Sequence, residues 1–135
     1  MPKYRIYHQQ SAKYVKPRPD TGKGSTVGAQ CLIFTAEVDS NDSETHFELI
    51  KGEWGPIMHV ESRLYVIKDH NDTLMLSDNV SDSGTDFKYS ERNQRIKCRN
   101  KAFWYGNNPA ACTPVIVRTS EDRDAVTFIL QEVSE

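Results

Sequence analysis

The segment best suited to binding chemistry lies around residue 105 and reads Trp104-Tyr105-Gly106-Asn107-Asn108. Neighbouring residues of a strand face opposite sides, so one of the two rings can enter a core while the other faces outward. An outward ring can pack against an apolar C–H surface, and the amides that follow can donate and accept hydrogen bonds. Asn and Gly are also common turn residues, so a turn without a ligand is the alternative interpretation.

Motifs for catalysis and for metal binding are absent or incomplete. Neither His-Glu-x-x-His nor Gly-x-Ser-x-Gly occurs. Residues 21–26 contain glycines and a lysine, but they lack the Gly-Lys-Ser/Thr order of a phosphate loop and a following helix. Asp39-x-Asn41 starts like a calcium loop, but Glu44 replaces the required glycine and Ile50 replaces the closing glutamate. We therefore expect a protein that is not an enzyme and that has no metal or other cofactor.

Composition and charge exclude several classes of protein. The chain has 135 residues, enough for one domain with a single core. Its net charge of -2 argues against a nucleic-acid-binding protein, which needs a basic surface. No apolar run approaches the roughly 18 residues of a membrane span, and no apolar stretch follows residues 1–5 as in a signal peptide. We expect a soluble protein that is cytoplasmic or is released without a signal peptide.

The cysteines Cys31, Cys98 and Cys112 are odd in number and have no metal-ligand spacing. One intramolecular disulfide would leave a cysteine unpaired, and no secretion signal is visible. We expect three reduced thiols in or near the core.

The elements that must position the candidate side chains form an internal repeat, which decides the fold when it is present. Each copy has an anchor residue, a turn residue three positions later and an aromatic three positions further on. The three copies are His8-Ser11-Tyr14, His59-Ser62-Tyr65 and Cys98-Lys101-Trp104. We expect both histidines to be hydrogen-bonded at the edge of the core.

Two later patterns repeat with the same order. Apolar triplets occur at 32–34, 74–76 and 115–117, and each is followed by a Phe-x-apolar pair. The pairs begin at Phe47, Phe87 and Phe128, which are 40 and 41 residues apart. Repeat one carries a short insertion around residues 39–42. These runs, divided by Gly, Pro, Asn, Asp and Ser, are typical of strands and turns.

We therefore predict an all-β chain with four short strands in each of three repeats, at about 4–51, 52–93 and 94–135. The expected strands are residues 4–7, 13–16, 31–35, 46–50, 57–59, 64–67, 73–77, 86–90, 95–99, 103–105, 114–118 and 126–132. Three units are too few to close a propeller, whereas three close a β-trefoil without a free barrel edge. The prediction is one β-trefoil domain with pseudo-threefold symmetry, in which Phe47, Phe87 and Phe128 share one core.

One motif resembles a known family. Glu53-Trp54-Gly55-x-Ile57-x-His59-Val60-x-Ser62 is similar to the repeat opening of the galactose-binding β-trefoil lectins of mussels, and more loosely of the ricin-B-like (R-type) lectins. Ser11-Ala12-Lys13-Tyr14-Val15-Lys16-Pro17 resembles the next stretch of that repeat. The family's His-Pro at the end of the second strand is replaced by Lys16-Pro17, Ile67-Lys68 and Gly106-Asn107. Its histidine at the end of the third strand is replaced by Thr35, Ser77 and Arg118, and the Gln-x-Trp signature is absent.

The resemblance implies a sugar pocket in each repeat, in the loop after the second strand and the turn after the third. By register Trp104 matches Tyr14 and Tyr65 as a core aromatic, so Tyr105 is the ring expected to face the sugar. The implied carbohydrate-binding residues are Lys16, Glu37 and Asp39 in repeat one, Asp69, His70, Asn71 and Asp78 in repeat two, and Tyr105, Gly106, Asn107, Asn108 and Asp122 in repeat three. Repeat one, with its insertion, is expected to be degenerate.

The function that the resemblance implies is a lectin for terminal galactose or N-acetylgalactosamine on glycoproteins or on glycolipids at a cell surface. Two alternatives remain open at this point: a β-trefoil protease inhibitor acting through the loop at 17–25, and a fascin-like cytoskeletal module. Because one shallow sugar site binds weakly, a homodimer that joins two sites is the expected assembly.

Overall fold

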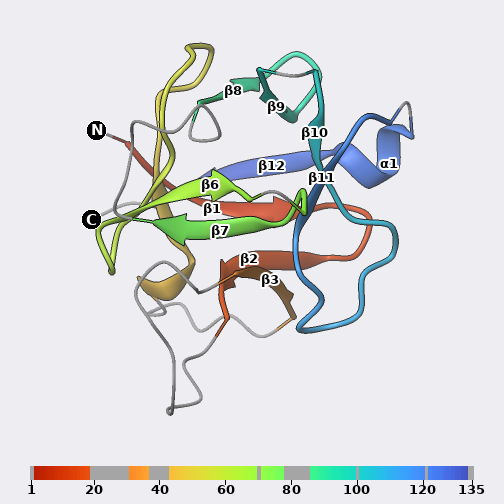
Figure 1. The fold of residues 1–135 in the computed structure, drawn as a ribbon, viewed down its shortest axis with the longest axis horizontal. Helices are drawn as coiled ribbons and strands as arrows, with labels where there is room; N and C mark the ends of the chain where they lie inside the picture. Colours follow the sequence, from red (N-terminus) through yellow and green to blue (C-terminus); the bar gives the residue numbers. More distant parts are fainter. Residues whose placement is uncertain are drawn as a thin grey trace.

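The structure is a computed structural model, and it describes residues 2–18, 31–36, 43–69, 71–77, 86–99, 101–120 and 122–133. These residues form twelve strands, one 3-10 turn and one single-turn helix (Figure 1). The strands are β1 (Lys3–His8), β2 (Lys13–Pro17), β3 (Leu32–Thr35), β4 (His46–Glu48), β5 (Met58–His59), β6 (Leu64–Lys68), β7 (Leu74–Ser77), β8 (Phe87–Ser90), β9 (Arg95–Cys98), β10 (Phe103–Tyr105), β11 (Ile116–Arg118) and β12 (Phe128–Glu132). The 3-10 turn η1 is Ser43–Thr45 and the helix α1 is Arg123–Val126.

Every predicted strand is present, and each end lies within two residues of its predicted position. The largest local difference is at 126–132, where α1 occupies the residues before β12. Asp122 begins this helix, because its carboxylate accepts a hydrogen bond from the Asp124 backbone N–H at 3.2 Å. No helix of the described ranges is long and apolar enough to cross a membrane.

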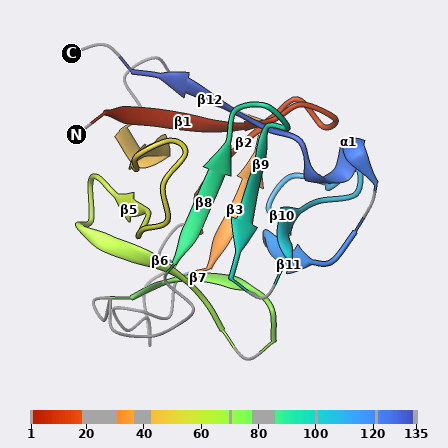
Figure 2. The ribbon, with the colours of Figure 1, turned by 90° about the horizontal axis from the view of Figure 1, so that it is seen from above.

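The inner strands lie around the core in the order β1, β4, β5, β8, β9, β12 (Figure 2). Strand β1 pairs antiparallel with β2, β4 and β12. It therefore joins the hairpin β2–β3 to the inner strands β4 and β12 on its two sides. The predicted barrel without a free edge is not fully formed, because the strands fall into one sheet of eight and one of four. Among the described residues, a few backbone contacts outside the regular strand pairs connect the two sheets, including Gly55 with Phe87, Gly52 with Tyr89 and Phe128 with Gln94.

The outer strands form the hairpins β2–β3, β6–β7 and β10–β11, one from each repeat. Their registers are equivalent, with the buried pairs Val15–Phe34, Val66–Leu76 and Trp104–Val117. The hairpins meet one another through the isolated bridges Cys31–Met75, Ile33–Pro114 and Thr73–Ile116. This arrangement confirms three four-stranded repeats related by a pseudo-threefold axis.

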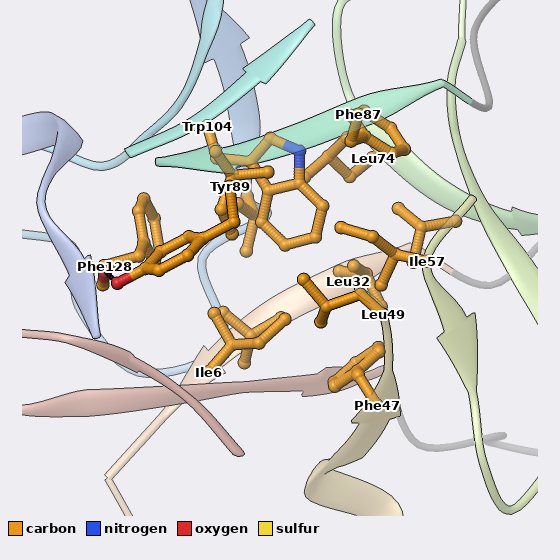
Figure 3. Close-up of a cluster of buried hydrophobic side chains, with 14 of the residues drawn as sticks. Ile6, Leu32, Phe47, Leu49, Ile57, Leu74, Phe87, Tyr89, Trp104 and Phe128 are labelled. Carbon is orange, nitrogen blue, oxygen red and sulfur yellow. Dashed lines mark hydrogen bonds between the residues drawn. The ribbon is translucent and has the colours of Figure 1, made fainter. Parts of the chain in front are cut away.

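The core lies where the three repeats meet, and Phe47, Phe87 and Phe128 belong to one buried cluster as predicted (Figure 3). Trp104 joins two of these rings, since it packs edge-on against Phe87 at 5.5 Å and against Phe128 at 6.2 Å between ring centroids. Tyr89 adds a hydrogen bond between repeats two and three, because its hydroxyl donates to the Phe128 carbonyl at 2.9 Å. Trp104 therefore links the phenylalanines of repeats two and three, while Phe34 of repeat one stacks on Phe128 at 6.3 Å between ring centroids.

The predicted register of repeat three is wrong by one residue. Phe103, not Trp104, is the equivalent of Tyr14 and Tyr65, because these three oppose Arg118, Thr35 and Ser77 across their hairpins. Tyr14, Tyr65 and Phe103 are half-buried on the outer side of their strands, whereas Trp104 is fully buried. The equivalent aromatic follows its anchor by five positions in repeat three, from Cys98 to Phe103, but by six positions in the other two repeats, which shifts the alignment.

The two anchor histidines lie at the edge of the core and make the same hydrogen bonds. The His8 Nε2 lies 3.1 Å from the Ala125 carbonyl oxygen and its Nδ1 lies 2.7 Å from the Ser11 Oγ. His59 repeats the arrangement with the Glu44 carbonyl at 2.7 Å and the Ser62 Oγ at 2.8 Å. A carbonyl only accepts, so Nε2 carries the proton and Nδ1 accepts from the serine. The expected core-edge role is confirmed.

Because His8 and His59 are buried, we expect the folded protein to lose stability in acid. Burial lowers the pKa of His8 and of His59 below the ordinary value of 6.5. The unfolded chain therefore binds protons first, so this stabilisation is complete above about pH 6.5 and is lost as the pH falls below it. We expect the thermal unfolding midpoint to decrease when the pH is lowered from 7.5 to 5.0. The decrease should be smaller in the double variant His8→Gln/His59→Gln. Each substitution should cost about 1–3 kcal/mol at pH 7.5, because a glutamine amide cannot replace the hydrogen bonds that the imidazole makes on its two sides, to the carbonyl and to the serine. Equal pH slopes in the two proteins would contradict the assignment.

The three cysteines are free, and they differ in exposure. Cys98 is buried and Cys31 is half-buried, but Cys112 is exposed, so the expected position in or near the core is wrong for Cys112. Burial raises the pKa of the Cys98 thiol to about 12. At neutral pH it is therefore almost entirely protonated and unreactive.

Alkylation should separate the three thiols. With iodoacetamide at pH 8 we expect Cys112 to react first and Cys98 last, because Cys98 holds roughly a thousandfold less thiolate than an ordinary cysteine. Mass spectrometry of the digested protein at successive times measures the order. The control is the same reaction in denaturant, where the three rates should converge. Early labelling of Cys98 in the native protein would show that its surroundings open readily.

Candidate functional site

A hollow of about 260 Å³ lies beside β10, where the three outer hairpins meet. It is lined by Phe34, Thr73, Tyr105, Gly106, Asn107, Pro109, Thr113, Pro114 and Ile116. Three of the residues predicted for repeat three, Tyr105, Gly106 and Asn107, therefore come together in one place. The other lining residues come from β3, from the start of β7, from β11 and from the loop at 106–114.

Tyr105 reaches the hollow because of strand alternation. Its neighbour Trp104 is fully buried, so Tyr105 emerges on the outer side of β10, opposite Ile116 of β11. The guanidinium carbon of Arg118 lies 5.5 Å from the centre of the Tyr105 ring. This contact orients the ring and places a positive charge at the edge of the hollow.

The loop at 106–114 forms the wall, and backbone hydrogen bonds fix it at both ends. Gly106 donates to the Ala125 carbonyl at 3.0 Å, and Cys112 donates to the Phe34 carbonyl at 2.8 Å. In the middle of the loop, the Asn108 backbone N–H donates to the Gln10 side-chain oxygen at 2.9 Å. Asn108 and Cys112 both have a positive φ, at 46° and 69°. The wall is therefore tied to the first hairpin and to β3.

Gly106 is required for the close approach of the loop to Phe34. A Cβ added at Gly106 would lie 2.5 Å from the Phe34 Cζ and 3.2 Å from the Pro109 Cγ. The phenyl ring of Phe34 fills that space and forms the floor of the hollow.

The polar groups around the hollow are available to a ligand. The side chains of Tyr105, Asn107, Thr73 and Thr113 carry two hydroxyls of threonine, one phenol and one amide. Among the described residues, none of these side-chain groups makes a hydrogen bond within the protein. Asn107 is exposed and the other three are half-buried. An aromatic ring beside several side chains with free hydrogen-bond donors and acceptors can hold a polyhydroxylated ligand.

Two of the predicted repeat-three residues do not line the hollow. Asn108 contributes its backbone to the wall, as described above. Asp122 uses its carboxylate to cap α1, and its own N–H donates to the Ser120 Oγ at 3.0 Å. Whether either side chain contacts a ligand stays a prediction.

The described part of the repeat-two site is a tight turn. The Asp69 carboxylate accepts backbone hydrogen bonds from Asn71 at 2.8 Å and from Thr73 at 2.9 Å. Lys68 pairs with Asp72, which has a φ of 59°, at 3.2 Å. This is the turn chemistry typical of Asp and Asn. His70 and Asp78 lie outside the described residues.

The repeat-one site is described only at Lys16. Its ammonium lies 3.8 Å from the Glu44 carboxylate, so the charge is already partly compensated. Glu37 and Asp39 lie outside the described residues, as does most of the loop at 17–25 proposed for a protease inhibitor.

Sequence reasoning missed Thr73, Thr113, Phe34, Pro109 and Pro114. Each predicted pocket lay within a single repeat, whereas this hollow lies between repeats. The apolar triplets contain a signal that could have placed Thr73 beside Ile116, since the residues directly before the triplets, Cys31, Thr73 and Pro114, all form the bridges where the hairpins meet. The positions of the prolines and of Thr113 have no counterpart in the other repeats.

A second hollow, of about 250 Å³, lies between β4, β5 and β8, and its surface is mostly apolar. It contains Trp54 and Gly55 of the lectin-like motif. Gly55 exchanges two backbone hydrogen bonds of 2.9 Å with Phe87, and Arg99 lies 4.2 Å from the Trp54 ring centre. The motif therefore joins the two sheets, which is a structural role. Within the described ranges, no three His, Cys, Asp or Glu side chains gather to hold a metal ion.

No family model matches the chain, and no curated protein matches its sequence. Solved structures resemble it in fold. A designed threefold-symmetric protein, ThreeFoil, has a TM-score of 0.77 over 97% of this chain and 99% of its own, at 11% identity. The C-half of an earthworm R-type lectin, solved with GalNAc, has a TM-score of 0.74 over 98% of this chain and 100% of its own, at 9% identity. A GlcNAcα1-4Gal-releasing endo-β-galactosidase from Clostridium perfringens has a TM-score of 0.75 over 99% of this chain but 33% of its own, at 8% identity.

These likenesses confirm the predicted fold. The chain is a β-trefoil, and its likeness to these structures extends over nearly its whole length.

The packing of the wall predicts different effects for two glycine substitutions. Gly106→Ala should destabilise the protein by about 1–3 kcal/mol because the new methyl overpacks Phe34. Gly55→Ala is the matched control, since its Cβ would meet nothing within 4 Å, and it should change stability by less than about 1 kcal/mol. Urea unfolding measures both. A neutral Gly106→Ala would show that the loop and Phe34 can separate, so that the hollow has no fixed floor.

Proposed function

We propose that this protein is a non-enzymatic lectin that binds a terminal galactose-type residue of a glycan in the hollow beside β10. The observation that carries the proposal is the Tyr105 ring, set beside the free polar groups of Asn107, Thr73 and Thr113. The fold supports it as well, because an R-type lectin of the same fold was solved with GalNAc.

The chemistry of the hollow suits this class of sugar. Galactose and N-acetylgalactosamine have an axial 4-hydroxyl, which leaves one face of the ring apolar and groups two hydroxyls on the other. The apolar face can pack on Tyr105, while the threonine hydroxyls and the amide bind sugar hydroxyls. The volume of about 260 Å³ is below the usual range of drug-sized pockets, so it suits one terminal sugar residue.

Titration with N-acetylgalactosamine, galactose and glucose tests the proposal. Tyr105→Ala and Asn107→Ala should each weaken galactose-type binding roughly 5- to 150-fold, as expected for a loss of about 1–3 kcal/mol. Tyr105→Phe keeps the ring and should weaken binding less than Tyr105→Ala. Glucose should bind more weakly than galactose to the parent protein.

Two matched variants locate the site. Asp122→Asn keeps a good helix cap, so a loss of binding there would bring the carboxylate into the site. Asn71→Ala reports on repeat two, which the proposal leaves unoccupied. If no galactose-type sugar binds, or if the Tyr105 and Asn107 variants bind like the parent, the proposal is wrong.

The homodimer stays a prediction that goes with this function. A second copy would raise the affinity for a multivalent surface without any new contact to the sugar. Light scattering at working concentration measures it directly.

A further inference from the structure

Cationic side chains gather on the outer face of the four-stranded sheet β8–β9–β10–β11. Phe87 and Tyr89 of β8 are buried, so Lys88 emerges on the opposite side of that strand. The buried residues of β9 are Ile96 and Cys98, so Arg95 and Lys97 emerge on the same outer face. Arg118 is exposed at the end of β11. Figure 2 shows β8 and β9 running side by side, with β10 and β11 next to them.

The strand register places two like charges directly opposite each other. Lys88 is the cross-strand partner of Lys97, an arrangement that destabilises a sheet when nothing lies between the charges. One position further along the face, Arg99 pairs with Asp86 and is neutralised. Among the described residues, no carboxylate forms an ion pair with Lys88 or Lys97.

The row continues across β10 to the hollow. Lys97 opposes Phe103, and Phe103 opposes Arg118 on β11. With strands about 4.8 Å apart, the row from Lys88 to Arg118 is roughly 14 Å long. Arg118 lies over Tyr105, which lines the hollow. The row therefore ends at the proposed sugar site.

Two features of this face show what it can bind. The guanidinium of Arg95 lies 5.2 Å from the Phe103 ring centre, and its buried Nε has no hydrogen-bond partner. Arg118 lies over Tyr105 in the same way. Each arginine covers one side of its ring, and Tyr105 also lines the hollow, so outside the hollow this face presents positive charge and N–H donors rather than bare aromatic platforms. Nucleobases need exposed rings for stacking, so this face suits oxyanions better than single-stranded nucleic acid.

We propose that the cationic row formed by Lys88, Arg95, Lys97 and Arg118 binds the sulfate or phosphate esters of a glycan whose terminal sugar occupies the hollow. This inference rests on the proposed lectin function and adds that the natural ligand is anionic. An ester oxyanion between Lys88 and Lys97 would remove their repulsion, and bidentate hydrogen bonds to an arginine would fix its orientation. The chain as a whole has a net charge of -2, so attraction of an anion to this face depends on its local charges and not on the overall charge of the protein.

The test compares a neutral galactose-terminated glycan with the same glycan carrying a sulfate ester or a phosphate ester, titrated at low and physiological salt. The ester-bearing forms should bind roughly tenfold more tightly than the neutral form, and the gain should shrink as salt screens the charges. Lys88→Gln/Lys97→Gln should lose this gain while binding the neutral glycan like the parent. The control Lys13→Gln/Arg63→Gln removes the same charge from other hairpins and should keep the gain.

A second readout does not depend on the sugar. Because the double variant removes an opposed pair of like charges, its thermal midpoint should equal or exceed that of the parent in sulfate-free buffer. Inorganic sulfate should raise the parent's midpoint more than the variant's. A lower midpoint for the variant, or an equal effect of sulfate on both proteins, would overturn the proposal.

The outcomes distinguish this inference from the lectin function. If neutral and ester-bearing glycans bind equally, the cationic row has no such role and the lectin function stands. If only ester-bearing glycans bind, and binding depends on Lys97, the row is supported and the neutral sugar site in the hollow is wrong. If single-stranded DNA of the same charge competes as well as the sulfated glycan, the row is a general polyanion surface, and its assignment to glycans falls. A difference between the sulfate and phosphate forms identifies the ester.

Discussion

Backbone hydrogen bonds between the three outer hairpins hold this fold together, and the position of the candidate site depends on them. Leu74 donates to the Val115 carbonyl at 3.0 Å, and Val115 donates to the Leu32 carbonyl at 2.8 Å. Such bonds do not depend on side-chain identity, so three repeats of different sequence can take equivalent positions. The loops inside the hairpins are then free to differ in length, and a pocket can form in one repeat without disturbing the others.

The hairpin loops of repeats two and three differ in length, and the hollow lies beside the longer one. In repeat two, five residues join β6 to β7, and the Asp69 carboxylate accepts backbone hydrogen bonds from Asn71 and Thr73 in a tight turn. In repeat three, the longer segment at 106–115 joins β10 to β11, and Gly106 lets it lie against Phe34. The same residue types, Asp, Asn and Gly, therefore make a closed turn in one repeat and an open wall in another. Composition alone does not separate the two outcomes.

The fold could be predicted because it depends on periodic features of the sequence. The spacing of Phe47, Phe87 and Phe128 follows from the need of each repeat to supply one ring to a shared core. The site was harder to predict because its lining residues come from all three repeats, and a repeat alignment compares equivalent positions instead of neighbouring ones. Helix α1 was missed because four residues are too short to show a helical period.

The register error in repeat three had a limited effect because strand alternation does not depend on the alignment. Whichever residue matches Tyr14, the two neighbours of a buried Trp104 must face outward. Phe103 and Tyr105 are those neighbours, so β10 belongs both to the hollow and to the cationic row. A neutral sugar gains little affinity from one ring and a few hydrogen bonds, whereas charges along the adjacent row can speed the encounter with an anionic glycan and favour it over a neutral one. Burial of Trp104 thus stabilises the core and also places the two surfaces side by side.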